Sequence, residues 1–490
     1  MPSTDTKAKV KAPRKESKAV NTPPTPSADH RELGVRQELF TSSIYSPGSP
    51  LFLPNGTRVF QKLQAFLRAQ YASFGFQEVI SPTIYKKSLW QKSGHWDNYA
   101  EDMFSVTGRG ATGEVEGKQI GEDEEFGLKP MNCPGHCLLF ASKARSFRDL
   151  PIRFSDFSPL HRNEISGALS GLTRVRRFHQ DDGHIFCRPS QVAKEISKTL
   201  DFVKLAYSTF RLGPYRLALS TRPKDHYMGT EEEWASAEAA LKKALEASGQ
   251  EWHINEGDGA FYGPKIDIIL KDSDGKEHQT ATIQLDFQLP KRFELEYIAP
   301  APEVESKGQT TTDPELLAKS GPVRPVMIHR AVLGSVERFM ALLIEHYNGK
   351  WPFWLNPKQI SVMTVSDNEE IVAFAKRAVS AIQGERGSGT LTPRGLHEPV
   401  FAVDLDITPR SLNKKAREAR QEGYGITVVV GRQNLESGMV SVGLRSLFSE
   451  DGLEKMQIGE TVVTAENAEK VDMRPEQLRN LLLQLEGNYL

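Results

Sequence analysis

The chain has 490 residues, 38% of them hydrophobic and 26% charged, and its 62 Lys and Arg residues against 63 Asp and Glu residues give a net charge of −1 at pH 7. This ordinary composition excludes a wholly disordered or collagen-like chain. The sequence has no run of about 18 apolar residues that would predict a transmembrane helix. Its three cysteines are too few for a disulfide framework and favour a reducing compartment. Because the net charge is nearly zero, any positively charged surface that binds nucleic acid must be confined to one part of the molecule.

The first 30 residues lack core-forming side chains, and Pro13, Pro23, Pro24 and Pro26 would break a helix there. They predict a solvated, disordered tail. A mitochondrial transit peptide is the alternative, because the segment is basic and contains Ser and Thr, although it has no apolar helical face.

Residues 31–355 alternate between helical and strand-like patterns. Apolar residues recur at helical spacing from Val59 to Phe74, Gly75 ends that helix, and a strand stops at Pro82. Further strands are predicted at 217–219, 265–270 and 280–287. Their imperfect alternation favours a mostly antiparallel sheet with helices packed on it. Two segments rich in Gly and Glu or in Pro, Glu, Thr and Lys predict flexible surface insertions, at 107–125 and 299–324.

A different pattern follows residue 356. Strand-like and helical segments alternate, which predicts a separate α/β domain of about 130 residues. The predicted strands are 360–365, 401–405, 426–430 and 440–444, and the predicted helices are 369–382, 411–421 and 475–485.

Unusual polar residues are concentrated in three segments, 131–137, 161–187 and 329–339. Arginines in apolar surroundings need an anionic partner, and Arg162, Arg174 and Arg338 are of this kind. Gly334 and Ser335 begin a predicted helix, where free backbone N–H groups favour phosphate. Guanidinium groups suit polyphosphate, but internal ion pairs with carboxylates explain the spacing equally well.

Cysteine and histidine side chains in the same segments suggest a zinc site. The best set is Cys133, His184 and His329, which would leave one position of a tetrahedral ion open to substrate. Because their spacing follows no standard pattern, other histidines remain rival ligands, namely His136, His161 and His179. The remaining cysteines, Cys137 and Cys187, are interpreted as small buried hydrophobic residues.

Five blocks of the sequence resemble the motifs of class II aminoacyl-tRNA synthetases, and specifically of the threonyl-tRNA synthetase family. They follow in that family's order, and the resemblance extends over about residues 30–490; the blocks are 94–99, 131–136, 174–187, 259–265 and 328–339. It implies an α+β catalytic domain at 31–355, built on the antiparallel class II sheet with flanking helices. A C-terminal α/β anticodon-binding domain at 356–490 would follow.

The resemblance also implies roles for individual residues. Arg162 would bind the α-phosphate of ATP and Arg338 the triphosphate tail, and the further ATP-contacting positions are Glu164, Arg174, Phe178, Gln279, Thr282 and Ser335. Threonine would be bound by Met131, Gln180, Asp182 and Tyr262, and zinc by Cys133, His184 and His329. His95 would lie near the tRNA 3′ end and Lys265 on the active-site strand.

The implied activity is that of a threonine–tRNA ligase, which forms threonyl-adenylate from ATP and then charges tRNA(Thr). Two arginines and Mg²⁺ would neutralise the phosphates, so no protein nucleophile is needed. One zinc ion per chain would select threonine over valine, because valine has no hydroxyl group to offer. Serine keeps the hydroxyl and loses only a methyl group, worth about 1 kcal/mol. Since only a short tail precedes the core, we expect no editing domain in the chain and detectable misactivation of serine.

The C-terminal domain departs from the family pattern. Anticodon contacts are expected at Arg417, Glu436 and Arg445, but Gly443 stands where an arginine is expected. The short core resembles fungal mitochondrial members, which favours the mitochondrial matrix over the alternative, the cytoplasm. A homodimer without membrane contact is also implied, because the first long helix and the strand ending at Pro82 match the class II dimer motif.

Three other functions compete with this interpretation. A non-catalytic tRNA-binding paralogue would have lost an ATP arginine or a zinc ligand, and the sequence keeps all of them. A seryl or prolyl enzyme would lack the Cys/His/His set. A zinc hydrolase needs a general base beside the metal, for which Glu164 is the only nearby candidate in the sequence.

Overall fold

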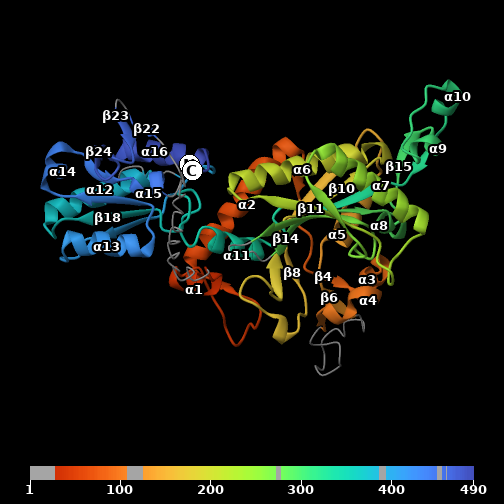
Figure 1. The fold of residues 1–490 in the computed structure, drawn as a ribbon, viewed down its shortest axis with the longest axis horizontal. Coiled ribbons are helices and arrows are strands. Elements are labelled where there is room, and N and C mark those ends of the chain that lie inside the picture. The colour runs from red at the N-terminus through yellow and green to blue at the C-terminus, as the bar shows by residue number, and fades with distance from the viewer. Residues whose placement is uncertain (1–27, 108–124, 272–276, 386–392, 450–454, 459–460) are drawn as a thin grey trace, which may run out of the picture.

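The computed structural model describes residues 28–107, 125–271, 277–385, 393–449, 455–458 and 461–490. The predicted tail, up to residue 27, and the predicted insertion, from 108 to 124, lie outside the described residues. The chain forms two lobes, each built on its own sheet (Figure 1). None of the helices in the described part of the chain is both long and apolar enough to cross a membrane.

The larger lobe is organised by an eight-stranded sheet in the order β12-β11-β13-β14-β17-β10-β7-β3. Neighbouring strands are antiparallel except for the outermost pairs, β11 with β12 and β3 with β7. The predicted mostly antiparallel sheet is therefore confirmed. In sheet order the strands are Trp252–Asn255, Tyr215–Ser220, Lys265–Lys271, Glu277–Asp286, Val326–Ala331, Asp182–Cys187, Ile152–Asp156 and Gln77–Glu78.

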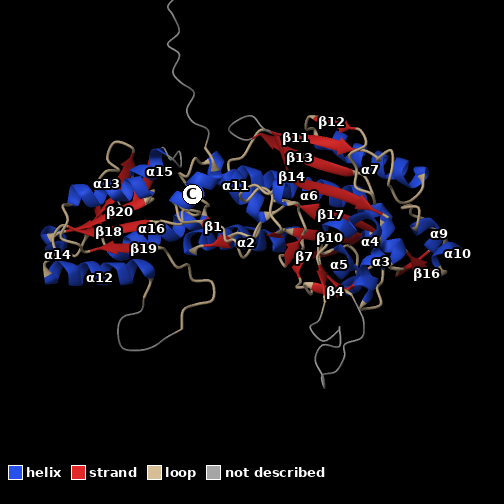
Figure 2. Ribbon diagram, turned by 90° about the horizontal axis from the view of Figure 1, so that it is seen from below, coloured by secondary structure: helices blue, strands red, loops and turns tan. Residues whose placement is uncertain are grey.

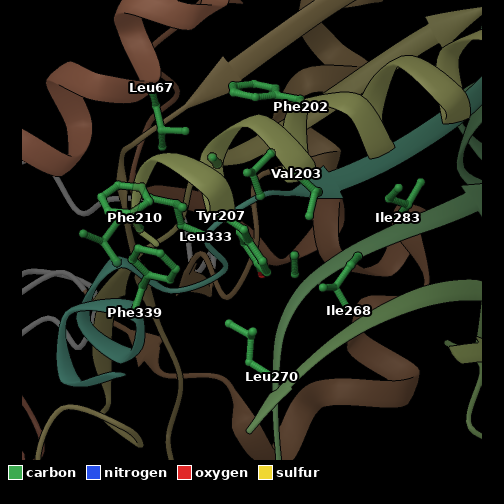
Figure 3. Close-up of a cluster of buried hydrophobic side chains, with 14 of the residues drawn as sticks. Leu67, Phe202, Val203, Tyr207, Phe210, Ile268, Leu270, Ile283, Leu333 and Phe339 are labelled. Atoms are coloured by element: carbon green, nitrogen blue, oxygen red, sulfur yellow. The ribbon is translucent and has the colours of Figure 1, made fainter. Parts of the chain in front are cut away.

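Long amphipathic helices cover one face of this sheet and enclose the main core (Figure 3). The predicted first helix is α2; it begins with Pro54 in its first turn and ends at Gly75, whose φ of +75° is the left-handed conformation that favours glycine. The same buried cluster contains Leu67 of this helix together with Phe210, Phe339 and Ile283. The helices on this side are α2 (Pro54–Phe74), α6 (Val192–Thr209), α7 (Glu231–Ser248) and α11 (Val336–His346).

Shorter helices cover the opposite face. Because side chains alternate along a strand, Ile185 belongs to the main core while its neighbour Phe186 packs with Cys137 and Phe140 of α5. This face carries the candidate site described below. Its helices are α3 (Lys87–Ser93), α4 (His95–Tyr99), α5 (Cys133–Ala141) and α8 (Gln288–Arg292).

Several small sheets lie outside the main sheet of this lobe. The strand pairs are β1 (Phe40–Thr41) with β2 (Leu51–Phe52), β4 (Ile84–Lys86) with β6 (Phe126–Leu128) and β5 (Ser105–Val106), β8 (Pro159–His161) with β9 (Arg177–His179), and β15 (Tyr297–Pro300) with β16 (Ser320–Val323). The remaining helical segments are α1 (His30–Arg36), α9 (Pro302–Glu305) and α10 (Pro314–Leu317), with short 3-10 turns at Ala100–Asp102, Ser166–Ala168 and Pro189–Gln191.

The predicted flexible insertion at 299–324 is instead a structured ribbon, so that prediction is wrong. Strands β15 and β16 pair from Tyr297↔Val323 to Pro300↔Ser320 and carry α9 and α10 at the far end of the lobe (Figure 1). Glu305 forms two hydrogen bonds of 2.6 Å with Arg188 and accepts another from the Tyr297 hydroxyl. The polar composition of the segment gives no sign of these contacts, because Arg188 lies more than 100 residues away in the chain.

The smaller lobe contains a five-stranded sheet in the order β19-β18-β20-β21-β24, with β18 parallel to both β19 and β20. Figure 2 shows α12 and α13 on opposite sides of these strands. All of the predicted strands and helices are found here, and the predicted α/β class is confirmed. The strands are β18 (Ile360–Thr364), β19 (Val403–Asp406), β20 (Ile426–Val430), β21 (Val440–Gly443), β24 (Val471–Met473) and the separate hairpin β22 (Lys455–Ile458) with β23 (Thr461–Thr464); the helices are α12 (Glu369–Gln383), α13 (Leu412–Glu422), α14 (Arg432–Ser437), α15 (Arg445–Ser449) and α16 (Pro475–Gly487).

Candidate active site

The register of the large sheet brings polar side chains from four strands into one row. His184 on β10 lies directly opposite His329 on β17, His329 lies opposite Gln284 on β14, and Gln284 lies opposite Lys265 on β13. Directly paired residues share a face of the sheet. The row therefore runs across the face that α5 covers, although its members are up to 145 positions apart in the sequence.

A cavity of about 380 Å³ opens over this row. The residues predicted for zinc and for threonine all line it, together with Lys265. They are Cys133, His184 and His329, and Met131, Gln180, Asp182 and Tyr262. The structure thus gathers into one cavity residues from four separate segments of the sequence, 131–133, 180–184, 262–265 and 329.

Cys133, His184 and His329 form a group whose sulfur and nitrogen ligand atoms all lie within 4.8 Å of one another. His184 Nε2 lies 3.0 Å from His329 Nδ1. The other ring nitrogen of His329, Nε2, is 2.8 Å from Asp286 Oδ2, and a carboxylate only accepts hydrogen bonds. His329 therefore carries its proton on Nε2 and points an Nδ1 lone pair at His184. One sulfur and two imidazole nitrogens backed by a carboxylate fit a zinc ion with an open position.

The rival histidines are not grouped with these ligands. His136 Nδ1 lies 2.7 Å from His184 Nδ1, on the side of that ring facing away from His329. His179 Nδ1 lies 2.9 Å from Glu337 Oε1, and His161 is on the small strand β8.

A second group that could hold a metal, Asp29 with His30 and Glu345, is engaged in hydrogen bonds. His30 Nδ1 lies 2.7 Å from Glu345, and its Nε2 accepts a 3.2 Å hydrogen bond from the Leu172 backbone. These bonds occupy both ring nitrogens, so this group is explained as a structural contact.

A second cavity, of about 210 Å³, adjoins the first. Every residue that the resemblance assigns to ATP lines it, namely Arg162, Glu164, Arg174, Phe178, Gln279, Thr282, Ser335 and Arg338. Ser335 is the N-cap of α11, and its hydroxyl accepts a 3.3 Å hydrogen bond from the Arg338 backbone N–H. Arg162 lies over the Phe178 ring, with its guanidinium carbon 5.1 Å from the ring centroid.

Positive charge is concentrated in this second cavity. Burial lowers the pKa of Arg338, and the nearby Arg162 and Arg174 lower it further. Glu164 binds Arg174 at 2.8 Å. The buried Nε of Arg162 has no hydrogen-bond partner among the residues that the structure describes. Three guanidinium groups that face one carboxylate form a cavity suited to a polyanion.

The two cavities share part of their walls, because Arg162, Gln180, Gln279 and Thr282 line both. Lys265 lines only the larger cavity, where its Nζ lies 3.0 Å from Asp267 Oδ2 and 3.1 Å from Asp258 Oδ2. Burial alone would lower the pKa of Lys265, but these two carboxylates outweigh it and raise the pKa, so the ammonium group stays charged.

The predicted threonine residues offer contrasting hydrogen-bonding groups. Burial raises the pKa of Asp182, which accepts a 3.3 Å hydrogen bond from the Asn132 backbone. Burial also raises the pKa of Tyr262, so its hydroxyl remains a donor; it donates to Gln284, and its ring stacks on His329 at 4.8 Å between centroids. The acceptor Asp182 and the donor Tyr262 thus line the same cavity.

His95 occupies a different position from the other predicted residues. It is absent from the described residues that line the two cavities and lies fully buried behind them. Its Nε2 is 2.8 Å from Met131 Sδ and 3.6 Å from Cys133 Sγ. Burial lowers the pKa of His95 to about 3, so the ring is neutral at pH 7.

The predicted anticodon residues lie on three helices of the smaller lobe. Arg417 on α13 is exposed, Glu436 on α14 lies 3.5 Å from Arg432, and Arg445 on α15 forms a 2.7 Å ion pair with Glu469. At Gly443 a Cβ atom would come within 2.5 Å of Thr427 Oγ1 on the paired strand. The structure thus gives a steric reason for glycine at the position where an arginine is expected.

Sequence reasoning missed Gln284, Asp267 and Asp286. Asp267 accepts hydrogen bonds from Gln279 and Ser220, and a longer one of 3.3 Å from Thr282. The signal that would have found Gln284 and Asp286 is the period of two along β14, because they share a face with the predicted Thr282. The same period along β13 places Asp267 on the face of the predicted Lys265.

Comparison with known proteins agrees with this geometry. Residues 115–308 match the model for the tRNA synthetase class II core domain (G, H, P, S and T), and residues 359–483 match the model for an anticodon binding domain. The probable mitochondrial threonine–tRNA ligase of Schizosaccharomyces pombe is 47% identical over 88% of this chain and 87% of its own length. The cytoplasmic threonine–tRNA ligase of Saccharomyces cerevisiae is 46% identical over 86% of this chain, which spans about half of that relative (52%).

Among solved structures, the RNA binding domain of threonyl-tRNA synthetase from Cryptosporidium parvum has a TM-score of 0.76 at 41% identity, with 93% of this chain and 98% of that chain covered. A class II aminoacyl-tRNA synthetase core followed by an anticodon-binding domain is therefore the class that fold and site define. Within that class, the chain belongs to the family of threonine–tRNA ligases, which are ATP-dependent enzymes.

Proposed function

We propose that this protein activates L-threonine with ATP to threonyl-adenylate and pyrophosphate, and then transfers the threonyl group to the 3′ end of tRNA(Thr). The observation that carries this proposal is the shared wall of the two cavities. Arg162, Gln180, Gln279 and Thr282 line both, so a nucleotide and an amino acid bound side by side would meet there. We also propose the domain division at residues 355 and 356.

Activation requires attack of the threonine carboxylate on the α-phosphate, with pyrophosphate as the leaving group. Two anions must approach each other, so fixed positive charge is the main catalytic need. In the proposal Arg162 neutralises the α-phosphate, Arg338 and Ser335 hold the triphosphate tail, and Arg174 with Glu164 closes the nucleotide side. Mg²⁺ bound to the phosphates would supply further charge neutralisation. Lys265, held between two carboxylates in the larger cavity, would orient the attacking carboxylate.

Threonine selection is assigned to the larger cavity. A zinc ion on Cys133, His184 and His329 would act as a Lewis acid that accepts the amino and hydroxyl groups of the substrate together. Asp182 would accept a hydrogen bond from the substrate hydroxyl, and Tyr262 and Gln180 would close the pocket around the side chain. Valine would leave Asp182 without its hydrogen bond, and an unpaired buried acceptor costs about 1–3 kcal/mol.

The same chemistry leaves serine poorly rejected, because serine offers the same hydroxyl and amino groups. We propose that the protein misactivates serine and does not hydrolyse Ser-tRNA(Thr). Rapid deacylation of Ser-tRNA(Thr) by the purified protein would contradict this part of the proposal.

The remaining assignments concern partners and location. We propose that the smaller lobe contacts the anticodon through Arg417, Glu436 and Arg445, and that the protein is a homodimer. Exposed apolar side chains at Ile80 (87% exposed) and Ile165 (75% exposed) on the larger lobe support a dimer, which light scattering on the purified protein tests. The mitochondrial matrix is the proposed location, with the cytoplasm as the alternative, and fluorescence of a C-terminal fusion distinguishes them.

The central experiment is ATP–pyrophosphate exchange with each amino acid separately, with bound zinc determined on the same sample. The proposal predicts strong exchange with threonine, weaker exchange with serine, none with valine, and about one zinc ion per chain. A folded, zinc-loaded protein that supports no exchange with any amino acid would favour a non-catalytic tRNA-binding role instead.

A further inference from the structure

Behind the proposed zinc ligands lies a group of fully buried polar side chains that the reaction does not use. His136, Asp156 and Lys129 are each 0% exposed, and they are absent from the described residues that line the two cavities. Removing charged groups from water costs several kcal/mol for each ion. A buried polar group of this kind therefore needs a structural or functional explanation.

Successive contacts connect a proposed zinc ligand, His184, to this buried group and end at Lys129. His184 Nδ1 lies 2.7 Å from His136 Nδ1, and His136 Nε2 lies 3.7 Å from Asp156 Oδ2. Asp156 is fixed in turn by 2.6 and 3.0 Å hydrogen bonds from the Ser81 hydroxyl and backbone N–H. The Lys129 ammonium donates a 2.8 Å hydrogen bond to the same Ser81 hydroxyl and lies 3.9 Å from Asp156.

Two proton arrangements are compatible with the short contact between His184 and His136, since only one of the facing Nδ1 atoms can donate. If His136 donates, its Nε2 is left with a lone pair facing the negatively charged Asp156, which is repulsive. If His184 donates, the His136 proton is on Nε2 and faces the carboxylate favourably. The second arrangement leaves the His184 Nε2 lone pair directed at His329 Nδ1, 3.0 Å away, with Asp182 Oδ1 3.7 Å from the same nitrogen. Two lone pairs and a carboxylate then face one point, where a bound cation would be stabilised by all three.

We infer that His136 is a positioning residue, which together with Asp156 holds His184 in the tautomer that presents its Nε2 lone pair to a zinc ion. This inference rests on the proposed zinc site. His329 is backed directly by Asp286 at 2.8 Å, whereas His184 is backed by a carboxylate through an intervening imidazole. The outer nitrogen of each ligand histidine thus has a partner that can orient the ring, a carboxylate for His329 and the His136 imidazole for His184. Asp156 acts on His136 by its charge, at 3.7 Å, and not through a hydrogen bond. Lys129 compensates the charge of Asp156, which lets the carboxylate stay ionised without contact with water.

The test measures zinc affinity, by competition with a chromophoric chelator, for the wild type and three variants of the full chain. His136→Leu removes the acceptor for His184 Nδ1–H and should weaken zinc binding 10- to 100-fold, the usual effect of losing an outer-shell partner. His136→Asn keeps a carbonyl acceptor near the Nδ1 position and should recover at least part of the lost affinity. His161→Leu is the matched control, because His161 lies outside the metal group, and its affinity should stay within twofold of the wild type.

Far-UV circular dichroism and thermal unfolding show whether each variant folds. Should His136→Leu fail to fold, ¹⁵N-histidine NMR of the zinc-loaded wild type decides: a proton on Nε2 of His136 supports the inference, and one on its Nδ1 overturns it. A folded His136→Leu variant with affinity within twofold of the wild type also overturns the inference, as does an equal loss in His161→Leu. A wild-type protein without affinity for zinc would instead refute the proposed metal site.

Discussion

Replacing Arg338 by alanine tests the proposed charge neutralisation most directly. Arg338 lies three residues after the N-cap Ser335 of α11, and its Nε donates a 3.2 Å hydrogen bond to the Thr173 backbone carbonyl in the smaller of the two cavities. A guanidinium about 4 Å from one phosphate charge contributes roughly 4 kcal/mol at an effective dielectric constant of about 20. Repulsion from Arg162 and Arg174, which contributes to the lowered pKa of Arg338, offsets part of this gain. We therefore expect Arg338→Ala to raise the activation barrier by about 2–4 kcal/mol.

The assay is threonine-dependent ATP–pyrophosphate exchange. In this assay the expected increase in the activation barrier corresponds to a loss of about 30- to 1,000-fold in kcat/KM. Arg338→Lys keeps the charge but not the bidentate geometry, so its loss should be intermediate. Arg216→Ala is the matched control, since Arg216 is exposed on β11 and pairs with Glu277. A loss below tenfold for Arg338→Ala, or a comparable loss for Arg216→Ala, would refute the reasoning.

Three further predictions concern the metal, the specificity and the pH dependence. Cys133→Ser, or removal of zinc by a chelator, should abolish bound metal and threonine activation together; full exchange activity in a metal-free sample would exclude Cys133 as a functional ligand. Asp182→Ala should reduce discrimination between threonine and valine by about 1–3 kcal/mol, measured as the ratio of their kcat/KM values, and an unchanged ratio would remove Asp182 from this role. Burial and the charge of Arg177 lower the pKa of His161 from its ordinary value of 6.5, so the unfolded chain binds more protons than the folded one just below that pH. Stability should fall as the pH drops below 6.5, and urea titrations should show a smaller fall for His161→Asn; equal falls would contradict the assignment.

The sequence alone was sufficient wherever local pattern determines local structure. The helical spacing from Val59 to Phe74 and the glycine after it define α2, and alternating apolar segments define the strands and helices of the smaller lobe. The resemblance likewise assigned eight residues to ATP, and all eight line one cavity. The predicted helices and strands are found because the apolar residues of a buried face recur every two to four residues. The ATP assignment stays a prediction, which the gathering of all eight residues in one cavity supports.

Only the tertiary structure decided which of several similar side chains meet. Nothing in the spacing distinguishes His136 from His184 as a partner for Cys133, yet the pairing of β10 with β17 sets His184 opposite His329 and leaves His136 behind them. The ribbon ending at Val323 could not be predicted for the same reason, since the Arg188 partner of its Glu305 is remote in the chain. Strand register and packing of helices on a sheet depend on contacts between distant segments. The sequence of each segment determines which side it buries, but the free energy of the whole assembly determines what that side touches.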